Sequence, residues 1–270
     1  MLTKKLLLGT IGAGAGLLLY GALVEAKKLS RERRVLRLPE WPASHAGYRV
    51  GLIADSHIRD RATIELTQRA LEFLVEERPD MIVIAGDMVQ DWKGPREEQI
   101  AQALEPLAGY EGNILAVPGN HDYYKGDPEQ LRPVYDQFGI RFLRNECWRV
   151  DGINWVGVDS ACAGVSDPYY ALRQSDPADP TIVVWHEPDA VQWLPRGPEL
   201  MLSGHSHGGQ FTTPWGWAPM TSRLGKTYLR GFYSEAPVPI YVSRGLGTTG
   251  FPSRMFCRAE AAVLTLEPGS

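Results

Sequence analysis

Short apolar runs alternate with stretches of helical periodicity in the first half of the chain. The apolar runs are Tyr48–Ala54, Met81–Ala85 and Ile114–Val117, each of a length typical of a buried strand. Between the first two runs, Thr63–Glu77 repeats apolar residues at helical spacing, and Arg96–Leu107 is expected to form a helix before the third. Strands that alternate with helices favour an α/β fold built on a parallel sheet.

A polar cluster follows each of these three runs. The clusters are Asp55-Ser56-His57, Gly86-Asp87 and Gly119-Asn120-His121-Asp122. In a parallel sheet, ligands bind at the carboxyl ends of the strands, because the loops there converge on one crevice. We therefore expect the three clusters to share one site.

After Tyr135 the strand candidates lie closer together and helical patterns become rare. The candidates are Trp148–Val150, Ile153–Val158, Thr181–Trp185, Leu200–Ser203, Ile240–Ser243 and Ala262–Leu266. Short strands separated by turns predict a second, more antiparallel sheet.

The amino terminus contains an uncharged apolar run. Leu6–Val24 has 19 residues, with Lys4 and Lys5 before it and Lys27 and Lys28 after it. At ~1.5 Å of rise per residue, such a run nearly crosses a hydrocarbon core of ~30 Å, and it exceeds the roughly 7 to 15 apolar residues of a signal peptide. We predict one retained N-terminal membrane helix, with a cleaved signal as the alternative.

This anchor divides the chain into an anchor with basic flanks (1–28), a tether (29–47) and a folded domain (48–270). Two Lys precede the apolar run, and five Lys or Arg follow it between residues 27 and 34. Because positive charge accumulates on the cytoplasmic side of membrane helices, the charge pattern favours a cytoplasmic domain.

Composition narrows the choice of function. The 270 residues carry a formal net charge of −4, which argues against nucleic acid as a partner, because phosphate-backbone binding needs clustered Lys and Arg. The three cysteines, Cys147, Cys162 and Cys257, form no CxxC pair, so neither a zinc ribbon nor a disulfide framework is indicated.

Five clusters carry side chains that bind metal ions. They are the three clusters above, His186, and Gly204-His205-Ser206-His207. Carboxylate, amide and imidazole groups form a mixed N/O donor set, which suits Mn, Fe, Zn or Co rather than thiophilic ions. Of the six histidines only His45 lies outside these clusters, so the pattern predicts a metal centre.

The order D-x-H, G-D, G-N-H-D, H and G-H-x-H, from Asp55 to His207, resembles the calcineurin-like metallophosphoesterases. Further segments resemble a membrane-associated bacterial branch of that family: His186–Asp189, Gly204–Gln210, Arg244–Gly250 and Phe256–Cys257. The resemblance implies an α/β fold, a four-layer α/β/β/α sandwich of two mixed sheets, here preceded by the membrane helix.

The resemblance also implies two divalent metal ions held by seven residues. The ligands of the first ion would be Asp55, His57 and His207. The ligands that complete the second would be Asn120, His186 and His205, with Asp87 as the bridge between the two ions.

Two neighbouring residues would be catalytic. His121 would face the scissile phosphate, and Asp122 would orient His121, as a carboxylate fixes the tautomer of an imidazole. Many relatives carry an acid three residues after the bridging aspartate, whereas this chain has Gln90 there.

Substrate contacts are harder to assign. Six positive residues follow the last ligand: Arg223, Lys226, Arg230, Arg244, Arg254 and Arg258. Of these, Arg244 and Arg254 are candidates for binding a second phosphate, with solvated surface charge as the alternative. Trp215 and Trp217 lie in an apolar loop, Trp215–Met220, that would contact an acyl chain, dip into a bilayer or pack in the core.

We therefore expect a metal-dependent hydrolase of phosphodiester or pyrophosphate bonds at a bacterial inner membrane. Its substrate would be a phosphorylated small molecule or lipid, such as the nucleotide-lipid UDP-diacylglucosamine. The alternatives are a general envelope phosphodiesterase or phosphomonoesterase, and a non-catalytic metal-binding scaffold at the membrane.

Overall fold

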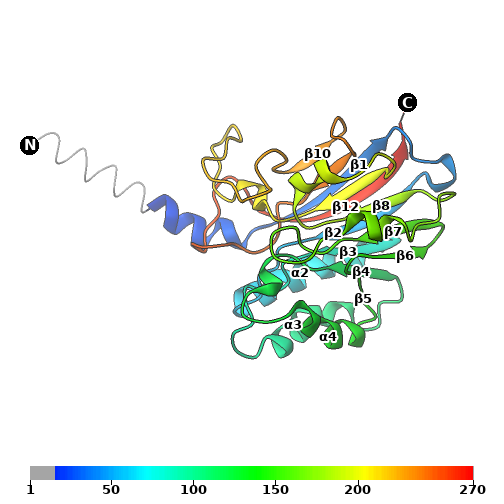
Figure 1. The fold of residues 1–270 in the computed structure, drawn as a ribbon. Coiled ribbons are helices and arrows are strands. Elements are labelled where there is room, and N and C mark those ends of the chain that lie inside the picture. Colours follow the sequence, from blue (N-terminus) through cyan, green and yellow to red (C-terminus); the bar gives the residue numbers. More distant parts are fainter. Residues whose placement is uncertain (1–15, 270) are drawn as a thin grey trace, which may run out of the picture.

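Two six-stranded sheets face each other in the computed structural model, which describes residues 16–269 (Figure 1). The strands of the first sheet, in spatial order, are β1 (Leu29–Leu38), β12 (Ala259–Pro268), β2 (Tyr48–Ile53), β3 (Met81–Ala85), β4 (Asn113–Val117) and β5 (Arg141–Phe142). β2 to β4 run parallel, as expected, and β5, which was not predicted, extends them in parallel. β12 contains Ala262–Leu266, which was expected in the second sheet, and it is antiparallel to β2.

The second sheet differs from its expected pairing. Its strands, in spatial order, are β10 (Gly231–Tyr233), β11 (Ile240–Val242), β9 (Leu200–Ser203), β8 (Thr181–Val184), β7 (Ile153–Gly157) and β6 (Glu146–Val150). The four inner strands are parallel, and only the two edge strands are antiparallel to their neighbours. Both sheets are therefore mixed.

Helices cover the outer faces of the sheets. Those of the first sheet are α2 (Arg61–Glu77), α3 (Arg96–Leu104) and α4 (Arg132–Gln137), and α5 (Pro168–Leu172) lies against the second. The 3₁₀ turns are η1 (Glu25–Lys27), η2 (Ala43–His45), η3 (Glu105–Leu107), η4 (His121–Tyr123), η5 (Pro128–Leu131), η6 (Pro188–Trp193) and η7 (His207–Gly209). Asp60 begins α2 with a capping box, because its carboxylate accepts from the Thr63 amide.

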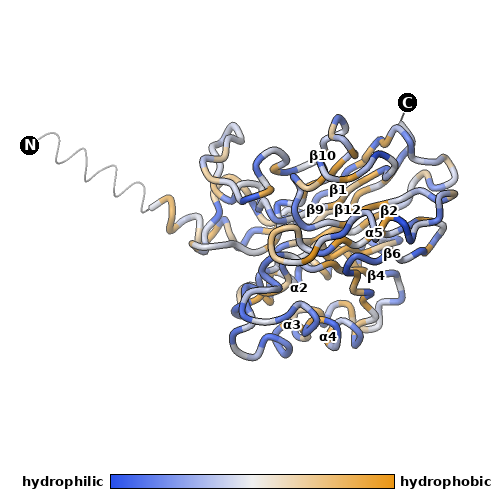
Figure 2. Tube along the Cα trace, viewed as in Figure 1, coloured by the Kyte–Doolittle hydropathy of each residue, from blue (hydrophilic) through white to orange (hydrophobic). Residues whose placement is uncertain are grey.

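Three hydrophobic cores separate these layers, and Figure 2 shows the apolar residues gathered along the strands. In β3, Ile82 and Ile84 point to the helices, whereas Met81 and Val83 point to the second sheet. A strand buried on both faces reads as one continuous apolar run, which is why the bounds predicted for β3 match those observed.

The expected tether contains a strand of the first sheet. Leu29–Leu38 pairs in parallel with β12 along all ten residues. Leu36 and Leu38 are buried while Val35 is 60% exposed, so the segment alternates with the period of a strand. The arginines on its exposed face conceal this alternation in the sequence.

The predicted membrane anchor is not found. Among residues 16–269 there is no helix of sufficient length and apolarity to cross a bilayer. Residues 16–23 are helical, and Gly21 in this helix lies so close to Ser253 that an added Cβ would be 2.1 Å from the serine Oγ. This finding contradicts the membrane anchor predicted over Leu6–Val24. The predicted inner-membrane location and cytoplasmic domain rested on that anchor and are not supported either. Residues 6–15 of the predicted anchor lie outside the described residues.

Candidate metal centre

Polar side chains from five strand ends meet at one edge of the molecule. They follow β2, β3 and β4 of the first sheet and β8 and β9 of the second. The seven residues expected to bind metal ions are all buried there: Asp55, His57, Asp87, Asn120, His186, His205 and His207. The parallel strands deliver them to a common edge, as the sequence analysis expects.

The loops that carry these residues have an uncommon backbone. Asp55, His57, Asp87, His205 and His207 have φ angles of 54°, 45°, 53°, 66° and 52°, in the left-handed region that side chains rarely adopt. Hydrogen bonds between loops hold this conformation, for example from the Asp55 amide to the Gly86 carbonyl at 2.9 Å. Backbone strain of this kind persists at functional sites because the surrounding structure enforces it.

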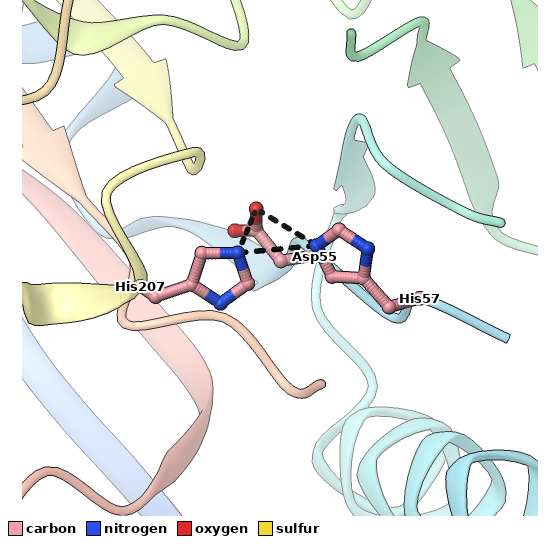
Figure 3. A group of neighbouring side chains, drawn as sticks. All are labelled: Asp55, His57 and His207. Atoms are coloured by element: carbon pink, nitrogen blue, oxygen red, sulfur yellow. Dashed lines mark hydrogen bonds and ion pairs between the residues drawn. The ribbon is translucent and has the colours of Figure 1, made fainter. Parts of the chain in front are cut away.

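The first cluster joins Asp55, His57 and His207 (Figure 3). The Nε2 atoms of the two histidines are 3.1 Å apart, and His207 Nε2 lies 3.4 Å from Asp55 Oδ1. His57 Nε2 lies 3.9 Å from the same carboxylate oxygen. Three ligand atoms from two distant parts of the chain thus converge on one point.

The second cluster joins Asp87, His186 and His205. His186 Nε2 lies 3.1 Å from Asp87 Oδ2, and His205 Nδ1 lies 2.9 Å from Asn120 Oδ1. Asp87 Oδ2 is also 3.5 Å from His57 Nε2 of the first cluster. Asp87 therefore stands between the two clusters.

Unpaired acceptor atoms show that the donor set fits cations. His186 Nδ1 donates to the Ala85 carbonyl at 2.7 Å, so its Nε2, which faces Asp87, is the ring atom that can hold a proton or a metal ion. His205 Nε2 likewise donates to the Arg223 carbonyl at 2.6 Å, which leaves Nδ1 as an acceptor facing the amide oxygen of Asn120. Acceptors that face each other in a buried site need a positive charge between them.

The pKa values of several site residues also favour the binding of metal ions. Although burial opposes ionisation, the neighbouring His186 holds the pKa of Asp87 well below its usual range. Burial lowers the pKa values of His57 and His207 well below the usual histidine value and raises the pKa of Asp55 to about 7. Neutral imidazoles at His57 and His207 and an ionised carboxylate at Asp87 are the protonation states in which these three residues bind metal ions.

Asp122 does not orient His121, contrary to expectation. Its buried carboxylate accepts from the main-chain amides of Gly119 at 2.8 Å, Asp87 at 3.0 Å and Val89 at 3.1 Å. These bonds tie the loop after β3 to the loop after β4, because a carboxylate next to both supplies the acceptors that their amides need.

The imidazole of His121 is instead oriented by the main chain. His121 Nδ1 donates to the carbonyl oxygen of Gln90 at 2.8 Å, which fixes the tautomer and leaves Nε2 as an acceptor. The His121 ring stands at 90° to the His57 ring, with centroids 4.5 Å apart, and packs on Tyr124. His121 is also close enough to His57 and Asp87 to join a metal-binding group.

A cleft of about 540 Å³ opens over these residues. Its floor includes Asp87, Asn120, His121, His205 and His207. Tyr124, Cys162, Gln210 and Phe251 also line it, and the sequence did not indicate them as substrate contacts. Two further lining residues, Met220 and Arg223, belong to the apolar loop and to the six cations named from the sequence. Tyr124 lies two residues after Asp122, the last residue of the G-N-H-D cluster, and this position was one available signal.

The four expected substrate contacts lie outside the lining of this cleft. Arg254 is fully buried, and its guanidinium donates to the carbonyl oxygens of His207, Arg244, Gly245, Gly247 and Cys257. Arg244 forms ion pairs with Glu32 and Glu260. Trp215 and Trp217 are 81% and 62% exposed. Both arginines therefore have structural partners, whereas both tryptophans remain open to contact.

The sequence is similar to those of several known metallophosphoesterases. A profile described as calcineurin-like phosphoesterase matches residues 48–209. An uncharacterized metallophosphoesterase of Helicobacter pylori (strain ATCC 700392 / 26695) is 32% identical over 80% of this chain, which spans 59% of that relative's length. The uncharacterized metallophosphoesterase YkuE of Bacillus subtilis (strain 168) is 29% identical over 96% of this chain and 91% of its own length. Phosphodiesterase YaeI of Escherichia coli (strain K12) is 29% identical over 85% of this chain and 86% of its own.

Proposed function

Because the chain belongs to the calcineurin-like phosphoesterase family, whose members are hydrolases that use two divalent metal ions, we propose that it hydrolyses phosphodiester or pyrophosphate bonds. The observation that carries the proposal is the pair of clusters linked by Asp87, in which buried acceptor atoms face one another. A site of this kind holds a positive charge that a phosphate group can approach.

The proposed ligands divide between two ions. One ion would be held by Asp55, His57 and His207, whose three ligand atoms converge. The other would be held by Asn120, His186 and His205, and Asp87 would bridge the two because its Oδ2 faces a histidine of each cluster. When bound, two divalent cations withdraw charge from a phosphate and lower the pKa of a water molecule towards ~7.

His121 is the proposed acid. Its Nδ1–H is held by the Gln90 carbonyl, so Nε2 would accept a proton from solvent, and the resulting imidazolium would give that proton to the leaving oxygen when the P–O bond breaks. His121 borders the cleft, so a leaving group bound there can reach it. Asp122 supports this step indirectly, because it holds the loop on which His121 lies.

The substrate that we propose has an apolar portion. Met220 and Phe251 line the cleft, and their side chains are 64% and 53% exposed. Trp215 and Trp217, in the same surface loop as Met220, are 81% and 62% exposed. Exposed apolar side chains next to a polar centre are typical of sites for amphiphilic ligands. A lipid-linked or nucleotide-lipid substrate such as UDP-diacylglucosamine has this chemistry, and the relative YaeI is named a phosphodiesterase.

Hydrolysis by the full chain tests the proposal. The purified protein is loaded with Mn²⁺, Fe²⁺, Zn²⁺ or Co²⁺ in turn and assayed with bis-p-nitrophenyl phosphate, p-nitrophenyl phosphate, and an acylated pyrophosphate beside its deacylated form. We expect the diester to be cleaved faster than the monoester, and the acylated pyrophosphate faster than its deacylated form.

Each outcome separates one alternative. Equal rates on the acylated and deacylated forms would favour a general phosphodiesterase over a lipid-directed enzyme. No hydrolysis of any substrate, despite two bound metal ions, would favour a non-catalytic metal-binding scaffold.

A further inference from the structure

We propose that Arg223 selects substrates that carry a second anionic group beside the scissile phosphate, as a pyrophosphate diester does. The inference rests on the proposed function, because it presupposes that the scissile phosphate binds over the two metal-binding clusters. It narrows the substrate class from phosphodiesters in general to those with an additional charge.

Arg223 is the cation of the cleft. Among the cleft-lining residues in the described chain, it is the only lysine or arginine. Its side chain is exposed, and within residues 16–269 no carboxylate forms an ion pair with it, whereas Arg244 is held by two. A guanidinium without an acidic partner is available to an anionic ligand.

The main chain fixes Arg223 beside the site. Its carbonyl oxygen accepts from His205 Nε2 at 2.6 Å and from the Cys162 thiol at 3.8 Å. Both of these neighbours line the cleft as well. Burial raises the pKa of Cys162 to about 11, and the positive charge of Arg223 acts against that rise, so the guanidinium is within electrostatic range of this cleft-lining thiol.

Arg223 is the positive charge available to a second anionic group of the substrate, because the proposed metal ions would bind the first. The proposed metal ions would engage the scissile group, which carries one negative charge in a phosphodiester. A pyrophosphate diester carries a second negative charge on the adjoining phosphoryl group. The other lining residues named above, Tyr124, Met220 and Phe251, offer no positive charge, whereas the planar guanidinium binds phosphate oxygens in pairs.

A matched pair of substrates tests this inference. The hexyl esters of uridine 5′-diphosphate and uridine 5′-monophosphate differ by one phosphoryl group. In the wild type we expect kcat/KM to be higher for the diphosphate ester, and in Arg223→Gln we expect that preference to fall about tenfold or more, as for a charge-assisted hydrogen bond. Arg223→Lys keeps the positive charge but lacks the planar guanidinium, so its preference for the diphosphate ester should lie between those of the wild type and Arg223→Gln.

Binding provides a readout that does not depend on turnover. Calorimetric titration with the methylene analogue of the diphosphate ester and the phosphonate analogue of the monophosphate ester should show the same loss of preference in Arg223→Gln. Lys226→Gln is the matched control, because Lys226 is an exposed cation three residues further on that does not line the cleft.

The ratio between the two esters decides the outcome. If Arg223→Gln lowers kcat/KM equally for both esters, or for neither, Arg223 does not read a second anion, although the proposed hydrolysis stands. If the wild type cleaves neither ester nor bis-p-nitrophenyl phosphate, the proposed function fails and the inference with it.

Discussion

His186 turns its Nε2 atom towards Asp87 because its Nδ1 atom donates to the main-chain carbonyl of Ala85, 2.7 Å away. Ala85 is the last residue of β3, and Asp87 follows it by two positions. A strand end of the first sheet therefore sets the tautomer of a histidine delivered by the second sheet. This hydrogen bond connects the two sheets, so the orientation of His186 towards Asp87 depends on how the sheets are placed relative to each other.

Removal of the shared carboxylate should separate this protein from its metal ions. We expect Asp87→Asn to lose bound metal and to lower kcat/KM for a diester by about 100-fold or more, since the residue faces both clusters. Metal content of the purified variant, measured by mass spectrometry, checks this. Asp91→Asn is the control, because Asp91 pairs with Arg96 instead.

His121→Ala should separate metal binding from turnover. We expect two equivalents of metal to remain while kcat falls about 10²- to 10⁴-fold, the usual contribution of a general acid. Metal content and kcat are measured on the same preparation. Because His121 lies close to His57 and Asp87, loss of one equivalent would instead make it a ligand.

Asp122→Ala should act on the loops rather than on the chemistry. Three main-chain amides would lose their acceptor, and an unsatisfied buried donor costs about 1–3 kcal/mol. We expect a lower free energy of unfolding in urea, with the loss larger than that of Asp91→Asn. A variant with unchanged stability but no turnover would point to a direct catalytic role for Asp122.

The capping box of α2 should make a pH-dependent contribution to the free energy of unfolding. Although partial burial opposes ionisation, the hydrogen bond from the Thr63 amide holds the pKa of Asp60 below its usual value. Asp60→Ala should lower the free energy of unfolding by about 1 kcal/mol at pH 7. Because the folded pKa is the lower one, this contribution is present above the unfolded value of about 3.9 and is lost as the pH falls below it.

Unfolding curves of the wild type and of Asp60→Ala, recorded at several pH values, check that sign. The difference between them should shrink towards acid pH. Glu65→Ala, which removes an exposed ion pair with Arg61 on the same helix, should change stability by less than about 0.5 kcal/mol.

The convergence of the seven expected residues could be predicted from the sequence because these residues follow buried strands. Met81–Ala85 is recognisable as an apolar run, and the loop after it must reach the edge where parallel strands end. The ligands of a convergent site can therefore be found from local patterns. β1 was missed because its arginines obscure the alternation of Leu36 and Leu38.

The cleft walls were not predictable in the same way. Arg254 looks like any other positive residue in the sequence, yet its guanidinium is occupied by carbonyl oxygens from His207 and from residues 244–257. Arg223 carries the same charge but lines the cleft, and no acidic residue among residues 16–269 forms an ion pair with it. Which arginine is free depends on long-range packing that no local pattern contains.

The pairing of β1 with β12 has a consequence for fragments of this protein. A fragment that starts near Ala43 lacks all of β1, and β12 then becomes the edge of the first sheet. Ten residues of exposed amide and carbonyl groups form a template for another chain, so such a fragment should self-associate through edge-to-edge pairing. Expression that begins before Leu29 keeps this edge covered.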